Sequence, residues 1–217
     1  MVGEREVQIP AGVVRLNGTL HIPAEAPGVV LFAHGAGSSR FSPRNRYVAS
    51  VLQEAQMGTL LFDLLTEGEA QDRAKVFDID LLAQRLMAAT DWLREQIPAD
   101  QMRLGYFGAS TGAAAALQAA AILGRAISAV VSRGGRPDLA EAYLDRVVAP
   151  TLLIVGEYDP QVIELNQMAY DLLQTEKDLV IVPGATHLFE EPGALEQVAH
   201  LASNWFRRYL APQGTAS

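Results

Sequence analysis

The sequence predicts an α/β protein built around a mostly parallel sheet, and three observations support this fold class. Short apolar runs alternate with longer segments whose apolar residues recur every three or four positions, as strands and helices do. The short runs are apolar almost throughout, which is typical of parallel strands with helices on both faces. The segment Gly108-Ala109-Ser110-Thr111-Gly112 joins an apolar run to an alanine-rich run, which predicts a sharp strand-to-helix turn.

The chain is predicted to open with an antiparallel hairpin. Residues 13–16 and 19–22 have strand character, and they flank Asn17-Gly18, a dipeptide that favours two-residue hairpin turns. We therefore place the first turn of the fold at Asn17-Gly18.

Strands and helices then alternate, with no linker to divide the chain. Apolar runs predict strands over residues 28–33, 59–63, 102–107, 127–132, 151–155 and 179–182. Helical spacing predicts helices over residues 46–56, 79–97, 111–123, 139–146, 162–174 and 195–210, the second ending before Pro98. Residues 64–78 are charged and lack a period, so we interpret them as a surface connection, with a flap over the site as the alternative. Residues 1–210 are expected to form one domain, followed by a loose tail over 211–217.

Composition excludes several classes of function. The 217 residues are 49% hydrophobic and 19% charged, as in ordinary globular proteins, and the absence of cysteine excludes disulfides and thiolate nucleophiles. A net charge of −8 with scattered arginines does not favour nucleic-acid binding. An acidic N-terminus and the lack of an apolar run of about 18 residues indicate no signal peptide or membrane span. We therefore expect a cytoplasmic enzyme.

Ser110 is the predicted nucleophile. The glycines two residues before and after it let the backbone turn tightly. The turn places the hydroxyl at the N-terminus of the following helix, where amide dipoles favour developing negative charge. Because a serine hydroxyl is a weak nucleophile at neutral pH, this role requires a base within hydrogen-bonding reach.

His187 is the preferred base among the four histidines. It follows a predicted strand and a Pro-Gly turn, at the carboxyl end of the strand, where open α/β sheets carry functional groups. His21 in the hairpin and His200 in the last helix are interpreted as surface or structural residues. His34 is interpreted as shaping its own loop by hydrogen bonding, with a base role or a substrate contact as the alternatives.

Asp159 is the preferred acid, which would fix the tautomer of the histidine and stabilise its charged form. It follows a buried strand and precedes a proline at the start of a helix. The same position suits a helix N-cap, so the two roles compete for its side chain. Glu157 is the reserve acid.

An oxyanion hole must hold the negative charge of the tetrahedral intermediate. One predicted donor is the amide of Thr111, the residue after the nucleophile. The other is the amide of Ala36, in a His-Gly loop that follows an early strand.

Arg133 follows another strand and could bind a substrate carboxylate through its planar guanidinium, although we favour a structural salt bridge. The glycines do not fit nucleotide-binding motifs: Arg40 stands where a dinucleotide fingerprint needs a small residue, and the Ser110 motif lacks Gly-Lys-Ser/Thr. No His-Glu-x-x-His occurs, so a metal site is not expected.

Four segments together resemble the α/β-hydrolase superfamily and, within it, small dienelactone-hydrolase-related proteins without a cap domain. They are the loop over residues 34–39, the turn over 108–112, and the Gly-Glu-Tyr-Asp and Gly-Ala-Thr-His segments over 156–159 and 184–187. The chain order of serine, aspartate and histidine is also that of α/β-hydrolases. The resemblance covers nearly the whole chain and implies a mostly parallel sheet of about eight strands and ester hydrolysis without a cofactor. Dienelactone hydrolases proper use a cysteine nucleophile, whereas this chain has Ser110, so a carboxylesterase is expected.

The expected function is therefore serine-dependent hydrolysis of small carboxylic esters, with a small-molecule ester as the partner. Two alternatives stay open. One is a non-catalytic binding module with this fold, because fold does not imply function. The other is acyl transfer or C–C bond hydrolysis by the same triad.

Overall fold

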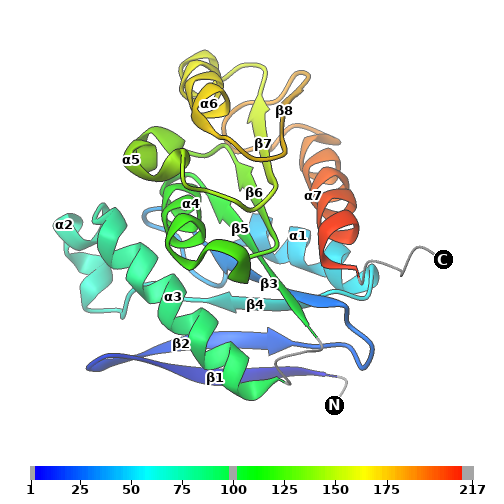
Figure 1. Cartoon of the computed structure of the whole chain (residues 1–217). Helices are drawn as coiled ribbons and strands as arrows, with labels where there is room; N and C mark the ends of the chain where they lie inside the picture. The colour runs from blue at the N-terminus through cyan, green and yellow to red at the C-terminus, as the bar shows by residue number, and fades with distance from the viewer. Residues whose placement is uncertain (1–2, 98–101, 212–217) are drawn as a thin grey trace.

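The computed structural model describes residues 3–97 and 102–211 and contains an eight-stranded sheet between two layers of helices (Figure 1). The strand order is β1-β2-β4-β3-β5-β6-β7-β8; β1 and β2 run antiparallel, as do β2 and β4, and the other pairs are parallel. The strands are β1 (Glu4–Ala11), β2 (Val14–His21), β3 (Gly28–Ala33), β4 (Gly58–Phe62), β5 (Arg103–Ala109), β6 (Ala129–Arg133), β7 (Thr151–Gly156) and β8 (Lys177–Val182).

Helices cover both faces of the sheet, because its central strands are apolar on both sides. The α-helices are α1 (Pro43–Glu54), α2 (Arg73–Val76), α3 (Ile79–Gln96), α4 (Thr111–Leu123), α5 (Glu141–Leu144), α6 (Pro160–Leu172) and α7 (Ala194–Leu210). Short 3-10 turns are η1 (Glu69–Gln71), η2 (Gly124–Ala126) and η3 (Pro137–Ala140). One core lies under α3 and α4, and the other under α1 and α7. The predicted fold class is confirmed, and the described residues include no cap domain.

The hairpin is present, but its predicted turn is wrong. The chain turns at Gly12 and Val13, where Gly12 has a φ of +66°, and Asn17-Gly18 lies inside β2, opposite Gln8 and Val7. Packing against the sheet decides this: a Cβ at Gly18 would lie 3.1 Å from the Phe62 Cβ. A turn there would also interrupt the buried face of β2, so the tertiary contacts override the local turn preference.

The other elements differ from the prediction mainly at their ends. Helix α1 begins three residues earlier than predicted, because Ser42 caps it by accepting a 3.3 Å hydrogen bond from the Asn45 amide. The helix predicted over 139–146 lies two residues earlier, and consists of η3 followed by one turn of α5. Pro98 and residues 212–217 of the predicted tail lie outside the described residues.

Residues 64–78 contain η1 and α2 and are tied to the body of the protein. The Glu69 carboxylate accepts a 2.8 Å hydrogen bond from Arg85 of α3, and Arg85 also donates to the Ala11 carbonyl at the hairpin turn (3.0 Å). The segment therefore packs between α3 and the hairpin, where it forms one wall of a cavity.

Candidate active site

Ser110 lies on a tight turn between β5 and α4. Its φ and ψ are 52° and −121°, a conformation that side chains rarely adopt. A Cβ at Gly112 would lie 2.1 Å from the Ala33 carbonyl oxygen, and one at Gly108 would lie 2.4 Å from the Ala113 Cα. Both glycines of the motif are therefore needed for close packing around a strained serine, as the motif predicts.

His187 and Asp159 meet on neighbouring loops at the carboxyl ends of β8 and β7. The His187 Nδ1 lies 2.6 Å from the Asp159 Oδ2. Asp159 occupies the N-cap position of α6, but its side chain makes no capping hydrogen bond. Of the two predicted roles for the Asp159 side chain, helix cap and partner of the histidine, the structure therefore shows the contact with His187. The reserve acid Glu157 instead accepts the Gly184 amide (2.7 Å) and holds the turn before His187.

The end of β6 lies between the serine turn and the His187 ring and contacts both. The Ser110 amide donates to the Arg133 carbonyl (3.3 Å), and a Cβ at the following Gly134 would lie 3.4 Å from the His187 Cε1. Among the described residues, no hydrogen bond joins the Ser110 Oγ to His187. Such bonds are often long without substrate and close only in the enzyme–substrate complex.

The two residues predicted to form the oxyanion hole are in contact with each other. The Ala36 amide donates a 2.9 Å hydrogen bond to the Thr111 Oγ1. Gly35, next to Ala36, is so close to the serine that a Cβ there would lie 3.1 Å from the Ser110 Cβ. The prediction used only the Thr111 amide, whereas the structure also brings the Thr111 hydroxyl into contact with Ala36, beside the predicted nucleophile.

His34 is buried at the end of β3 and has both ring nitrogens engaged. Its Nε2 accepts the Leu64 amide (3.0 Å), which makes Nδ1 the donor to the Gly35 carbonyl (3.0 Å). Burial lowers the pKa of His34, so the neutral ring is favoured. His34 therefore links the loops that follow β3 and β4 and has no free nitrogen for a base role.

Among the described residues, no carboxylate forms a salt bridge with Arg133. Its side chain is 6% exposed, and its Nη2 lies 3.5 Å from the Asn45 Oδ1. The guanidinium lies 5.9 Å from the centre of the Phe189 ring, two residues beyond His187. Burial, and then the charge of Arg44, lower the pKa of Arg133 to about 10. The favoured salt bridge is thus absent, and the cation lies buried under the histidine loop.

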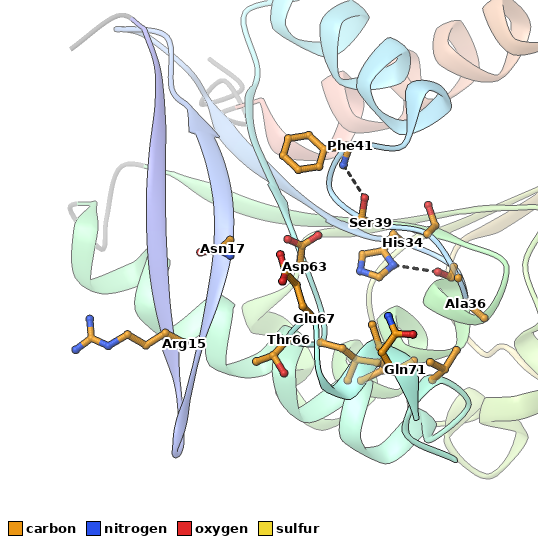
Figure 2. Close-up of a pocket in the computed structure, with 17 residues that line it drawn as sticks. Arg15, Asn17, His34, Ala36, Ser39, Phe41, Asp63, Thr66, Glu67 and Gln71 are labelled. Carbon is orange, nitrogen blue, oxygen red and sulfur yellow. Dashed lines mark hydrogen bonds between the residues drawn. The ribbon is translucent and has the colours of Figure 1, made fainter. Parts of the chain in front are cut away.

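A cavity of about 430 Å³ opens beside the loop that follows β3 (Figure 2). The hairpin, the loop over residues 34–41 and the segment over 65–76 line it, with His34 and Asp63 between them. Leu65, Val76 and Leu82 supply apolar surface, whereas Thr66 and Glu67 supply polar groups. Ala36 lines this cavity but Ser110, His187 and Arg133 do not, so the cavity adjoins the candidate site on the side of Ala36.

The described residues show neither a metal-binding cluster nor a membrane-spanning helix. They contain no cluster of three or more histidine, aspartate or glutamate side chains arranged to hold a metal ion. None of their helices is long and apolar enough to span a membrane.

A crystal structure of a dienelactone hydrolase from Anabaena variabilis is 58% identical and superposes with a TM-score of 0.92, covering 95% of this chain and 98% of that one. An esterase from Pyrococcus furiosus shares the fold, with a TM-score of 0.77, at 19% identity over 97% of this chain and 94% of its own.

Two Mycobacterium tuberculosis strains have proteins named as phosphoribosyl transferases that are 58% identical over 211 residues, or 97% of this chain. The match spans 48% of their length, so this chain corresponds to about half of them. The profile of the dienelactone hydrolase family matches residues 16–210, which include the serine turn and both loops of the aspartate–histidine pair. The chain belongs to the dienelactone hydrolase family.

Proposed function

We propose that the protein is a serine hydrolase that cleaves small carboxylic esters through an acyl-enzyme on Ser110. Membership of the dienelactone hydrolase family supports hydrolysis as the class of reaction. The dependence on serine and the ester substrate are our proposal. The observation that carries it is the 2.6 Å contact between His187 and Asp159, on two loops beside a strained serine turn. A serine, a histidine and a carboxylate in this arrangement are the components of the catalytic triad, in which the histidine is the base and the carboxylate orients it.

In the proposed mechanism, Ser110 attacks the ester carbonyl and His187 takes its proton. Asp159 holds His187 with Nδ1 protonated, so that Nε2 faces the serine as the base, and stabilises the imidazolium that forms. The proton then passes from His187 to the leaving alcohol. Water attacks the acyl-enzyme in the same way, and the acid is released. The Thr111 amide donates to the oxyanion, and this chemistry requires no cofactor.

The cavity beside Ala36 supports a small substrate. Its volume of about 430 Å³ lies near the lower end of ligand pockets, which range from about 300 to 1,000 Å³. We propose that it holds the part of the ester on the oxyanion side, with Leu65 and Val76 contacting apolar carbons. Acetate or butyrate esters should therefore be hydrolysed faster than long-chain esters.

Arg133 enters the proposal as a residue that could bind a substrate carboxylate, since its charge has no carboxylate partner in the described residues. His34 is proposed to shape the loop and the cavity wall, not to act on the proton. Its two hydrogen bonds to backbone groups support this role.

The test is reaction with a fluorophosphonate probe, together with p-nitrophenyl acetate and butyrate turnover, in the wild type and Ser110→Ala. Labelling and turnover that are both lost in the variant would establish an activated serine. A well-folded wild type that is not labelled would overturn the proposal in favour of a non-catalytic binding module. Product analysis distinguishes hydrolysis from acyl transfer and C–C bond cleavage, because each reaction releases different products.

A further inference from the structure

The Ala36 amide, which was predicted to hold the oxyanion, already has an acceptor in the structure. It donates to the Thr111 Oγ1 at 2.9 Å, across 75 positions of the sequence. Thr111 is 4% exposed, so water does not readily replace this bond. A backbone amide has a single N–H to donate. Because the N–H of Ala36 already points at the Thr111 hydroxyl, a direct hydrogen bond from Ala36 to the oxyanion would be weak.

The Thr111 hydroxyl, in contrast, has a proton to give. A hydroxyl carries one donor and two acceptor positions, and here one acceptor position is filled by Ala36. In the described residues, the Thr111 Oγ1 accepts this bond and donates none to a protein group. Accepting a hydrogen bond also polarises the hydroxyl and strengthens it as a donor.

The position of Thr111 brings this proton to the reacting centre. Thr111 is the first residue of the 13-residue helix α4 and directly follows Ser110. Its own amide is among the free donors of the helix N-terminus, where negative charge is favoured. The hydroxyl and the amide of Thr111 therefore lie at the same end of the helix, next to the serine.

We propose that Thr111 supplies two donors to the oxyanion, its amide and its side-chain hydroxyl, and that Ala36 acts through this hydroxyl. Ala36 is then a positioning residue: its amide fixes the Thr111 rotamer and directs the hydroxyl proton toward the carbonyl oxygen of the ester. No proton is transferred in this step, because the hydroxyl only donates a hydrogen bond. This inference rests on the proposed serine hydrolase function.

In the competing interpretation of the same contact, which we call the plug, the Thr111 side chain blocks the oxyanion position. The Thr111 hydroxyl would then occupy the oxyanion position in the free protein and rotate away when substrate binds, which would release the Ala36 amide as a direct donor. The two interpretations predict opposite effects of removing the hydroxyl, so one substitution separates them.

The experiment compares Thr111→Val, which keeps the shape but has no hydroxyl, with Thr111→Ser, which keeps the hydroxyl. Thr90→Val is the matched control, because Thr90 is also buried and hydrogen-bonded, to Tyr106 and the Leu86 carbonyl, but belongs to α3. The kcat and KM for p-nitrophenyl acetate are measured, with the inhibition constant of a trifluoromethyl ketone, whose adduct with the serine carries an oxyanion. Thermal unfolding of each variant accompanies the kinetics.

We expect Thr111→Val to lower kcat by about 10²–10³-fold, the usual effect of losing one oxyanion donor, with little change in KM. The trifluoromethyl ketone should weaken by a similar factor, Thr111→Ser should stay within about tenfold of the wild type, and Thr90→Val should lose only thermal stability. A Thr111→Val variant as active as the wild type or more active would overturn the inference and support the plug. Equal losses in Thr111→Val and Thr111→Ser would also overturn it, because the methyl group and not the hydroxyl would then matter. A wild type without fluorophosphonate labelling would instead refute the proposed function itself.

Discussion

The loops after β3 and after β8 each bring a histidine close to the serine turn, but the two rings are in opposite situations. His34 is buried, and both of its nitrogens are bonded to backbone groups. The His187 side chain is 40% exposed and has one nitrogen on the Asp159 carboxylate. A base needs a free nitrogen and a partner that stabilises its charged form, and only His187 has both. The comparison teaches that nearness to the serine does not make a histidine a base.

The largest effect is expected from His187→Ala. Without the base, kcat for p-nitrophenyl acetate should fall by about 10⁴–10⁶-fold, as in other serine enzymes that lose this group. Steady-state kinetics and fluorophosphonate labelling measure the loss. His200→Ala, on the exposed side of α7, is the control and should retain wild-type activity. A His187→Ala variant with a tenth of the wild-type activity would refute the assignment.

Asp159→Asn is expected to lower kcat by about 10⁴-fold, because the amide cannot hold the histidine in the required tautomer. Glu157→Gln is the matched change in the reserve acid. Because Glu157 only accepts the Gly184 amide, its variant should keep activity within about tenfold. Equal losses in the two variants, measured with the same ester, would contradict the choice of Asp159.

His34→Ala should affect stability more than chemistry. It leaves the buried Leu64 amide without an acceptor, which costs about 1–3 kcal/mol in the free energy of unfolding. Urea unfolding measures this cost, and kcat should fall by less than about tenfold. A loss of kcat as large as in His187→Ala, with unchanged stability, would show that His34 acts on the proton.

The same histidine predicts how stability depends on pH. Burial lowers the pKa of His34 in the folded protein, while in the unfolded chain it titrates near its usual value of about 6.5. The unfolded state therefore binds a proton first as the pH falls below about 6.5, and that binding favours unfolding. We expect the His34 contribution to stability to be present above this pH and lost as acidity increases. Urea unfolding between pH 5 and 8 should show a steeper loss in the wild type than in His34→Ala.

The smallest effect is expected from Arg133→Met. The buried guanidinium has no carboxylate partner in the described residues, so an apolar side chain should leave the free energy of unfolding unchanged or raise it by about 1 kcal/mol. Turnover of an uncharged ester should change little, whereas KM for an ester with a free carboxylate should rise if Arg133 binds that group. Equal KM changes for the two esters would remove Arg133 from substrate binding.

Local patterns were sufficient for most elements of the fold. The bounds of β3 and α4 agree with prediction, because an apolar run between polar segments and an alanine-rich stretch after the glycine motif are signals within a few residues. The hairpin turn was wrong because Asn17-Gly18 has the stronger local preference, while the register of β1 on β2 places Gly12, with a φ of +66°, at the turn. For the site, the contact of Asp159 with His187 agrees with the predicted pairing, whereas the described residues form no salt bridge with Arg133, although one was favoured.

By itself the sequence determined the alternation of strands and helices, the tight turn at Ser110 and the chain order of serine, aspartate and histidine. These depend on periodicity and on glycine spacing, which act between near neighbours in the chain. Only the tertiary structure decided that the Ala36 amide meets the Thr111 hydroxyl, that the His34 Nε2 meets the Leu64 amide, and that Arg133 has no carboxylate partner among the described residues. The physical reason is that such contacts join residues far apart in sequence. Their distances are set by strand order and register, which follow from packing of the whole sheet.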